Sequence, residues 1–107
     1  MDLAKYVRHV QDFPKKGIGF KDITTLLKDA DAFRCSVQEL IKPFRDKEIE
    51  LVAGIEARGF LFASAIALEL NIGVIPIRKK GKLPAETLQE EFTLEYGTDT
   101  IEMHADA

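Results

Sequence analysis

The spacing of apolar residues predicts three helices in this chain. They cover residues 2–10, 29–44 and 58–70, where apolar side chains recur at helical intervals. Asp2 could cap the first helix, and either Asp29 or Asp31 could cap the second. Because proline damages a helix interior, the second helix should end or kink at Pro43.

Two short apolar runs flank the third helix and predict strands. Residues 49–55 read I-E-L-V-A-G-I, which is typical of a strand buried on both faces, and residues 74–77 form the next strand. The order strand, helix, strand is a βαβ unit, whose strands should be parallel and joined by a right-handed crossover. Since parallel sheets need cover on both faces, the predicted fold class is α/β. Residues 20–24 fit either a short strand or an irregular loop.

The last part of the chain alternates between apolar and polar residues, which predicts an antiparallel β-hairpin. Over residues 87–96 the apolar side chains lie on one side, with Glu90 out of place, and the polar ones lie on the other. Residues 97–99, G-T-D, are a turn signal, and residues 101–104 alternate again in a returning strand. A hairpin that is polar on one face belongs at the edge of a sheet or on an arm.

Composition restricts the class of protein. A chain of 107 residues allows one domain, so we expect a single domain over residues 1–107. With 46% apolar and 31% charged residues the chain is an ordinary globular mixture, which excludes a disordered, collagenous or disulfide-scaffold protein. The single cysteine, Cys35, excludes an internal disulfide, fits a reducing compartment and is interpreted as a packed thiol.

The chain shows no targeting or membrane segment. Its start carries an acid at position 2 and lacks the run of about 7–15 apolar residues of a secretory signal. Residues 59–70, the longest largely apolar stretch, are far short of the ~20 residues that a membrane span needs. The sequence therefore predicts a cytoplasmic protein without membrane contact.

Charge is distributed unevenly along the chain. The net charge of −3 gives no overall basic field for nucleic acid. All fifteen basic residues lie within residues 1–82, together with eleven acids, whereas residues 83–107 hold the other seven acids. The basic part could attract an anion, while the acidic tail pairs with it or faces water.

The first candidate motif is E-A-R-G-F at residues 56–60, between a strand and a helix. Backbone N–H groups and the helix dipole there favour an anion. Arg58 adds a forked cation, and Gly59 allows close approach of a ligand or backbone. Alternatively, Arg58 pairs with Glu56 and Gly59 is a packing residue.

The second motif is R-K-K-G-K-L-P at residues 78–84, directly after the next strand. Loops at the carboxyl ends of parallel strands bind ligands in α/β sheets, and a dense cation cluster suits a phosphate or diphosphate. Gly81 would give the backbone freedom to fold around the anion. Alternatively, this is a solvated basic loop that the acidic tail neutralises.

Two further motifs are weaker on their own. In L-E-Y-G at residues 94–97, Glu95 could act as a general acid or base and Tyr96 could orient a ligand, unless Glu95 is a solvated carboxylate. In F-P-K-K-G-I-G-F-K-D at residues 13–22, Phe20 offers a flat face to a planar heterocycle, unless it is a core residue in a loop.

Common cofactor and metal motifs are missing from the sequence. It contains no G-x-x-x-x-G-K-[ST], G-x-G-x-x-G after a strand, H-E-x-x-H or C-x-x-C. His9 and His104 lack metal-ligand spacing and are interpreted as surface residues. We therefore predict no metal-ligating residue.

In order, the four motifs resemble those of the adenine phosphoribosyltransferases, a type I phosphoribosyltransferase family of purine salvage. The similarity runs from about Phe13 to Ala107, and R-K-x-G-K-L-P followed by L-E-Y-G is its most specific part. The resemblance implies a glycosyltransferase that forms AMP and diphosphate from adenine and 5-phosphoribosyl 1-diphosphate. It also implies a homodimer, and Mg²⁺ that is carried with the diphosphate substrate.

The resemblance further implies an incomplete type I phosphoribosyltransferase fold and two groups of binding residues. The fold would be a partial parallel sheet with flanking helices, with a flexible loop and hairpin arm at residues 79–104. The residues that would border adenine are Gly19, Phe20 and Lys21. The residues that would bind diphosphate are Arg58, Arg78, Lys79 and Lys82. Of these, Arg78, Lys79 and Lys82 would reach the diphosphate in the neighbouring subunit's site.

The same resemblance assigns catalytic roles to two residues. Glu95 would manage the purine ring proton as the glycosidic bond forms, and Tyr96 would close over the site on a mobile loop. Such closure would exclude water from a reaction that could otherwise become hydrolysis.

The sequence departs from the family pattern at two places. Lys21 stands where an arginine is usual, which keeps the charge but loses a bidentate fork. The sugar-phosphate motif, in which a strand leads into two adjacent acids and a Thr- and Gly-rich loop, does not occur in the 107 residues. We therefore expect a truncated domain that is inactive alone. The alternative is a non-catalytic anion- or purine-binding or assembly module that needs a separate C-terminal half.

Overall fold

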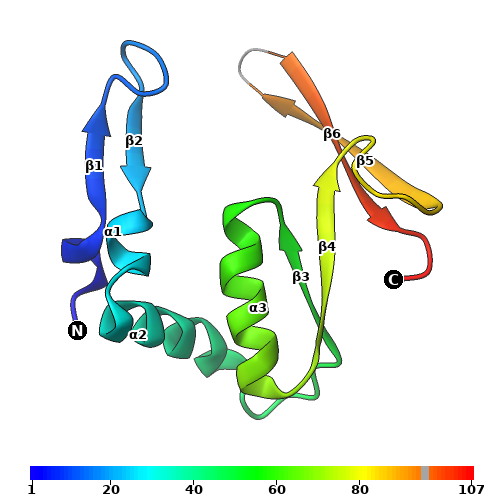
Figure 1. The fold of residues 1–107 in the computed structure, drawn as a ribbon, viewed down its shortest axis with the longest axis horizontal. Coiled ribbons are helices and arrows are strands. Elements are labelled where there is room, and N and C mark those ends of the chain that lie inside the picture. The colour runs from blue at the N-terminus through cyan, green and yellow to red at the C-terminus, as the bar shows by residue number, and fades with distance from the viewer. Residues whose placement is uncertain (95–96) are drawn as a thin grey trace. The chain divides into compact units, whose positions relative to one another are not determined.

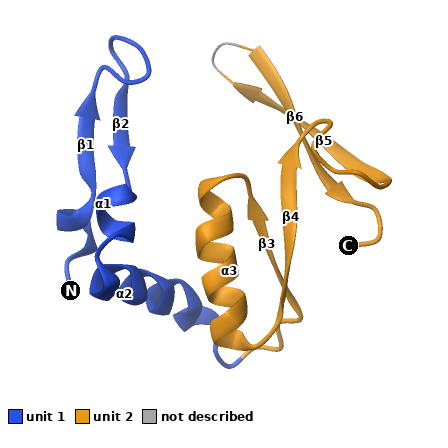
Figure 2. Cartoon of the chain, viewed as in Figure 1, with its two compact units in different colours: residues 1–46 blue, residues 47–107 orange. Residues whose placement is uncertain are grey.

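The computed structural model describes residues 1–94 and 97–107 (Figure 1). Its helices are the 3₁₀ helices Leu3–Tyr6 and Lys42–Phe44 and the α-helices α1 (Thr24–Leu27), α2 (Ala30–Ile41) and α3 (Arg58–Leu70). Its strands are β1 (Arg8–Gln11), β2 (Gly19–Asp22), β3 (Leu51–Ile55), β4 (Gly73–Lys79), β5 (Thr87–Leu94) and β6 (Gly97–His104). The chain divides into two compact units, residues 1–46 and residues 47–107 (Figure 2).

The first unit begins with an antiparallel hairpin of β1 and β2. Arg8 lies opposite Asp22 and Val10 lies opposite Phe20. The prediction of a helix over residues 2–10 is therefore wrong beyond Tyr6, although Asp2 does cap the short 3₁₀ helix through the Ala4 N–H. Pairing with β2 outweighs the helical spacing, because a helix this short has little stability of its own. Residues 20–24 fitted either a strand or a loop, and the structure shows a strand that ends at Asp22.

Asp22 joins this hairpin to α1 through its carboxylate. Its Oδ1 accepts hydrogen bonds from the Thr24 hydroxyl at 2.6 Å and the Thr24 N–H at 2.8 Å, and its Oδ2 forms an ion pair with Arg8 at 2.6 Å. These contacts, led by the bonds from Thr24, lower the pKa of Asp22 from its ordinary 3.8 to about 2.

Helix α2 carries the core of the first unit. Of the two predicted caps the structure selects Asp29, whose side chain accepts a hydrogen bond from the Ala32 N–H at 2.9 Å. Ala32, Val37 and Ile41 of α2 are buried, and Ile41 is only 1% exposed. The predicted break at Pro43 is confirmed, because α2 ends at Ile41 and Lys42–Phe44 is a 3₁₀ helix.

The second unit is built on the βαβ unit of β3, α3 and β4, and its parallel pairing is confirmed by the register of Leu51 with Gly73 and Ile55 with Ile77. The sheet has the strand order β3-β4-β6-β5, so the hairpin of β5 and β6 forms its antiparallel edge, as predicted. The α/β fold class is likewise confirmed.

The prediction that β3 is buried on both faces is wrong. Gly54 is buried beneath α3, but Leu51 and Ile55 are 47% and 50% exposed. Successive side chains of a strand point to opposite faces, so Leu51 and Ile55 lie on the face away from α3. Within the described part of this unit α3 is the only helix, and it covers one face.

Residues 97–99 lie in a strand and not in a turn. Residues 97–99 belong to β6 and pair with Leu94, Thr93 and Phe92 of β5, so the prediction of a turn at these residues is wrong. A continuous ladder of cross-strand pairs outweighs the local turn preference of G-T-D.

Candidate functional site

The residues that follow β3 and β4 lie at one edge of the sheet. Ile55 pairs with Ile77, so the carboxyl ends of these parallel strands meet. The Glu56 N–H donates to the Ile77 carbonyl at 2.9 Å, and the peptide bond between Glu56 and Ala57 is cis. Helix α3 then begins at Arg58. This edge thus holds Arg58 near residues 78–82, which we call the cationic segment.

Glu56 ties the two strand ends together. Its Oε1 accepts hydrogen bonds from the Lys79 N–H at 2.8 Å and from Arg78 Nε at 3.2 Å. The Lys79 hydrogen bond, followed by the charge of Arg78, lowers the pKa of Glu56, so its carboxylate is ionised at neutral pH. The Arg78 guanidinium carbon also lies 6.0 Å from the centre of the Phe60 ring. The sequence offered a pairing of Glu56 with Arg58, whereas the structure brings Arg78 to this carboxylate.

The cationic segment is exposed from Lys79 onward, and Arg78 is half-buried. Gly81 has a φ of +86°, in the region that favours glycine, and a Cβ built there would meet nothing within 4 Å. The space beside Gly81 is therefore open, and hydrogen bonds from the Gly81 and Lys82 N–H groups hold the turn.

Glu102 on β6 hydrogen-bonds to the same segment, and sequence reasoning did not identify this residue. The residue is 5% exposed. It accepts hydrogen bonds from the Gly81 N–H at 2.5 Å, from Gln89 Nε2 at 3.0 Å and from the Thr87 hydroxyl. These bonds, led by that from Thr87, lower the pKa of Glu102 and keep it charged. The alternation of residues 101–104 placed Glu102 on a strand, but nothing local showed that its strand face is covered.

The residues predicted to border adenine lie together in β2 of the first unit. Phe20 is half-buried, and its ring meets that of Phe13 edge to face at a centroid distance of 5.0 Å. Gly19 lies beside the His9 ring, where a Cβ would come within 3.2 Å of His9 Cε1. Lys21 is exposed. The diphosphate residues Arg58, Arg78, Lys79 and Lys82 belong to the second unit.

The two predicted catalytic residues, Glu95 and Tyr96, lie outside the described residues. Strand β5 ends at Leu94 and β6 begins at Gly97, so the described chain reaches both sides of this pair. Their roles stay predictions.

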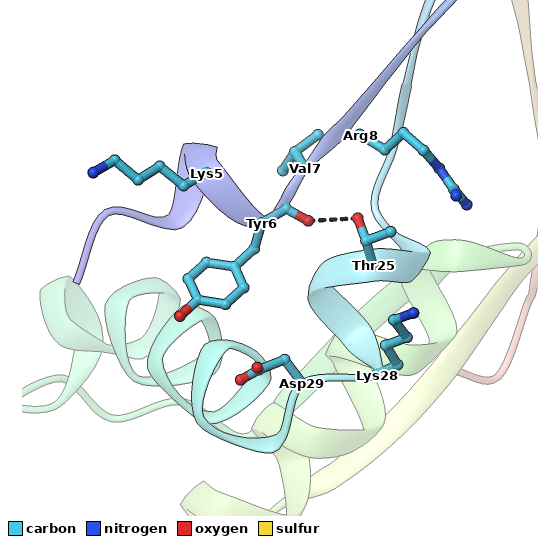
Figure 3. Close-up of a pocket in the computed structure, with 7 residues that line it drawn as sticks. All are labelled: Lys5, Tyr6, Val7, Arg8, Thr25, Lys28 and Asp29. Carbon is cyan, nitrogen blue, oxygen red and sulfur yellow. Dashed lines mark hydrogen bonds between the residues drawn. The ribbon is translucent and has the colours of Figure 1, made fainter.

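A separate hollow of about 480 Å³ occurs in the first unit (Figure 3). Its lining residues are Lys5, Tyr6, Val7, Arg8, Thr25, Lys28 and Asp29. Several polar groups there already have partners: the Thr25 hydroxyl donates to the Tyr6 carbonyl at 2.5 Å, and Arg8 pairs with Asp22. None of the predicted site residues lines this hollow.

Residues 1–94 and 97–107 contain neither a cluster of metal ligands nor a helix that could span a membrane. No group of three or more His, Cys, Asp or Glu side chains comes together in this part of the chain to hold a metal ion. Among the same residues, no helix combines the length and apolar character needed to cross a bilayer.

Comparison with known proteins gives one consistent result. No family model matches the chain. The adenine phosphoribosyltransferase of Brachyspira hyodysenteriae is 53% identical over 107 residues, which is all of this chain and 63% of that protein. The enzyme of the same name from Desulfitobacterium hafniense is 52% identical over 107 residues, again all of this chain, and 62% of that protein.

Solved structures agree in fold. The crystal structure of adenine phosphoribosyltransferase from Thermoanaerobacter pseudethanolicus matches with a TM-score of 0.92 and 53% identity, over 99% of this chain and 62% of that one. The Giardia lamblia enzyme, complexed with 9-deazaadenine, matches with a TM-score of 0.90 and 36% identity, over 96% of this chain and 57% of that one. The chain therefore spans about three fifths of the length of these relatives. From end to end, in both sequence and fold, the chain is similar to about three fifths of these adenine phosphoribosyltransferases.

Proposed function

We propose that this chain supplies the adenine- and diphosphate-binding part of an adenine phosphoribosyltransferase. That enzyme would join adenine to 5-phosphoribosyl 1-diphosphate and release AMP and diphosphate. The observation that carries the proposal is the sheet edge where Glu56 joins the end of β3 to the cationic segment, in a chain 53% identical to an enzyme of this name.

The cations at this edge suit a leaving diphosphate. Negative charge gathers on the diphosphate as the glycosidic bond to it breaks, and preplaced cations stabilise that charge most where it develops. Arg58, at the start of α3, adds its guanidinium to the partial positive charge of the helix N-terminus. Lys79 and Lys82 would contribute exposed ammonium groups, and Arg78 would act with one nitrogen engaged by Glu56. In a homodimer, these three would serve the neighbouring subunit's site.

The hairpin of the first unit suits a planar base. The contact with Phe13 supports the ring of Phe20, and aromatic rings stack well on heterocycles. Gly19 and Lys21 would border the base with backbone and ammonium groups. Glu95 would exchange the purine ring proton with adenine, and Tyr96 would close over the site.

Magnesium enters the proposal as part of the substrate. Mg²⁺ is commonly bound through substrate phosphates and retains water ligands, so a dedicated set of protein ligands is not required. We therefore propose that it arrives and leaves with the diphosphate groups. A homodimer and a cytoplasmic location complete the proposal.

Calorimetry of the 107-residue chain with magnesium diphosphate tests the binding role. We expect measurable binding that Lys82→Ala weakens by about tenfold, because hydrogen bonds to charged groups have about that effect. Lys5→Ala removes an exposed cation of the first unit and serves as the matched control. Equal affinities for the two variants would contradict the assignment of the cationic segment to diphosphate.

Conversion of labelled adenine to AMP tests the reaction itself. We expect no AMP from the 107 residues alone, because they contain no Thr- and Gly-rich sugar-phosphate loop. A chimera that adds the remaining part of the Brachyspira hyodysenteriae relative should form AMP, and Lys82→Ala should slow it. AMP formation by the 107-residue chain alone would refute the need for that loop.

A second candidate function is a binding module that works with a separately supplied remaining part. The chain covers only 63% of the Brachyspira hyodysenteriae relative, which leaves room for this arrangement. AMP formation on mixing the two separate pieces, without covalent fusion, would favour it.

A further inference from the structure

In the cationic segment, the backbone N–H groups of residues 79–82 all donate hydrogen bonds within the protein. The Lys79 N–H donates to Glu56 at 2.8 Å and the Gly81 N–H donates to Glu102 at 2.5 Å. The intervening Lys80 N–H donates to the Thr100 carbonyl at 3.1 Å, and the Lys82 N–H donates to the Lys79 carbonyl at 3.2 Å. The four amide groups of residues 79–82 therefore all face protein acceptors.

This arrangement changes how the segment can meet an anion. The sequence suggested that Gly81 frees the backbone to fold around a phosphate, as in an anion-binding nest. Here the amides are already used, so an anion must be bound by side chains. The positions of those side chains then depend on whatever fixes the backbone.

We propose that Glu102 is a positioning residue, which anchors the turn of the cationic segment through the Gly81 N–H so that the lysine side chains point to an anion. The inference rests on the proposed function, because diphosphate is the anion in question. Glu102 suits this role because its one carboxylate joins three elements. The residue lies on β6, its Oε1 accepts a hydrogen bond from the Gly81 N–H of the segment, and its Oε2 accepts hydrogen bonds from Thr87 and Gln89 of β5.

Charge supports the anchoring role. The segment carries four cations in five residues, and their mutual repulsion opposes a single compact turn. Glu102 and Glu56 are both ionised, and each accepts a hydrogen bond from the backbone of the segment rather than capturing a lysine side chain. The two acids thus reduce the repulsion while leaving the ammonium groups of Lys79 and Lys82 exposed.

Hydrogen exchange measured by NMR on the 107-residue chain tests the anchor directly. In the wild type, the Gly81 amide should exchange at least about tenfold more slowly than an unstructured amide, because the bond to Glu102 must open first. Exchange at the unstructured rate would overturn the proposal without any variant.

Glu102→Gln tests the anchor by substitution. Its amide is uncharged and has one acceptor oxygen in place of two, so the Gly81 bond loses the charge that strengthens it and competes with Thr87 and Gln89 for that oxygen. We expect Gly81 to exchange about tenfold faster and magnesium diphosphate to bind about tenfold more weakly. Two controls should stay within about twofold of the wild type in both readouts: Glu91→Gln, which removes an exposed charge from the same hairpin, and Thr87→Val, which leaves the Gly81 bond in place.

The outcomes separate this inference from the proposed function. Unchanged Gly81 exchange in Glu102→Gln, with diphosphate still bound, would refute the anchor and leave the proposed function standing. If Gly81 exchanges faster in Glu102→Gln but this variant binds magnesium diphosphate as tightly as Glu91→Gln does, the claim that the anchor positions the lysine side chains for an anion is refuted. If the wild type binds no diphosphate and Glu102→Gln still loses the protection of the Gly81 amide, the proposed function is contradicted and the anchor is supported. Equal loss of affinity in Thr87→Val would indicate a merely structural role for Glu102.

Discussion

Gly54 lies where β3 and α3 approach most closely, and its replacement by alanine tests the packing that sets the site edge. A Cβ at this position would lie 2.7 Å from Ala63 Cβ and 2.9 Å from the Gly59 carbonyl oxygen. Ala63 is itself buried in α3, and the Gly59 contact is backbone. The helix must therefore move as a body, since neither neighbour can rotate away.

The size of the effect follows from these distances. Carbon atoms pack best at about 3.5–4.0 Å, so α3 would have to withdraw from β3 by roughly 1 Å. Overpacking of this kind costs about 1–3 kcal/mol. In a chain of this size, each 1 kcal/mol corresponds to about 4–8 °C in Tm.

Gly73→Ala is the matched control for this substitution. Gly73 is also a strand glycine of the second unit, but a Cβ there would meet only the end of the Leu51 side chain, at 3.0 Å. That side chain is half-exposed and can turn aside, so we expect a change within about 0.5 kcal/mol. Both substitutions reduce the backbone freedom of the unfolded chain alike, so their difference isolates the steric cost.

Urea unfolding of the 107-residue chain, followed by circular dichroism, measures the effect. Gly54→Ala should lower the free energy of unfolding more than Gly73→Ala by at least about 1 kcal/mol. Adding Ala63→Gly removes the 2.7 Å contact but keeps the one to Gly59, so the double variant should recover part of the loss and show coupling of about 0.5 kcal/mol or more. Equal stability of Gly54→Ala and Gly73→Ala, or the absence of coupling, would refute the close packing of β3 and α3.

Three further predictions concern the first unit. Asp29→Ala should cost about 1 kcal/mol in the free energy of unfolding, because the α2 cap is lost, whereas Asp31→Ala, which breaks no cap bond, should cost less. Ile41→Ala should cost about 2–5 kcal/mol, against less than about 0.5 kcal/mol for Leu68→Ala, since the two side chains are 1% and 83% exposed. Because the folded pKa of Asp22 is lowered to about 2, its contribution to stability is complete above its ordinary value of 3.8 and is lost as the pH falls through about 2. Thermal unfolding between pH 4 and pH 2 should therefore show a steeper loss of stability in the wild type than in Asp22→Asn, and parallel curves would contradict this.

The elements with strong local signals could be predicted from the sequence. Helix α3 runs over the predicted residues 58–70, and α2 starts after a predicted cap and stops before Pro43. The βαβ order was enough to predict the parallel pair of β3 and β4. The local pattern could not show whether a segment forms its own helix or turn or instead pairs with a distant strand. Residues 8–10 have helical spacing, but they pair with β2 instead, and residues 97–99 have turn composition, but they extend a ladder.

The candidate site could be predicted in part, for a similar reason. The end of β3 and the cationic segment come together because strand order and direction are enough to place them at one edge. The partners within that edge depend on distances of a few ångströms that spacing does not encode. Glu56 lies two residues from Arg58 in sequence, yet its carboxylate bonds to Arg78 and Lys79 across the sheet. Glu102 reaches Gly81 only because β6 pairs beside β4.

These contacts show where the acidic C-terminal part of the chain meets the basic residues. The sequence left open whether the acidic tail pairs with the basic part or faces water, and within the second unit Glu102 of that tail bonds to the cationic segment. Four cations in the segment with two bound carboxylates, Glu56 and Glu102, leave a surplus of two positive charges. Because both carboxylates bind backbone amides, this surplus resides on outward side chains. The segment can thus attract a polyanion while its like charges stay together in one compact turn. If the lysine side chains were instead paired with acidic side chains, those ion pairs would have to break before the lysines could bind the anion.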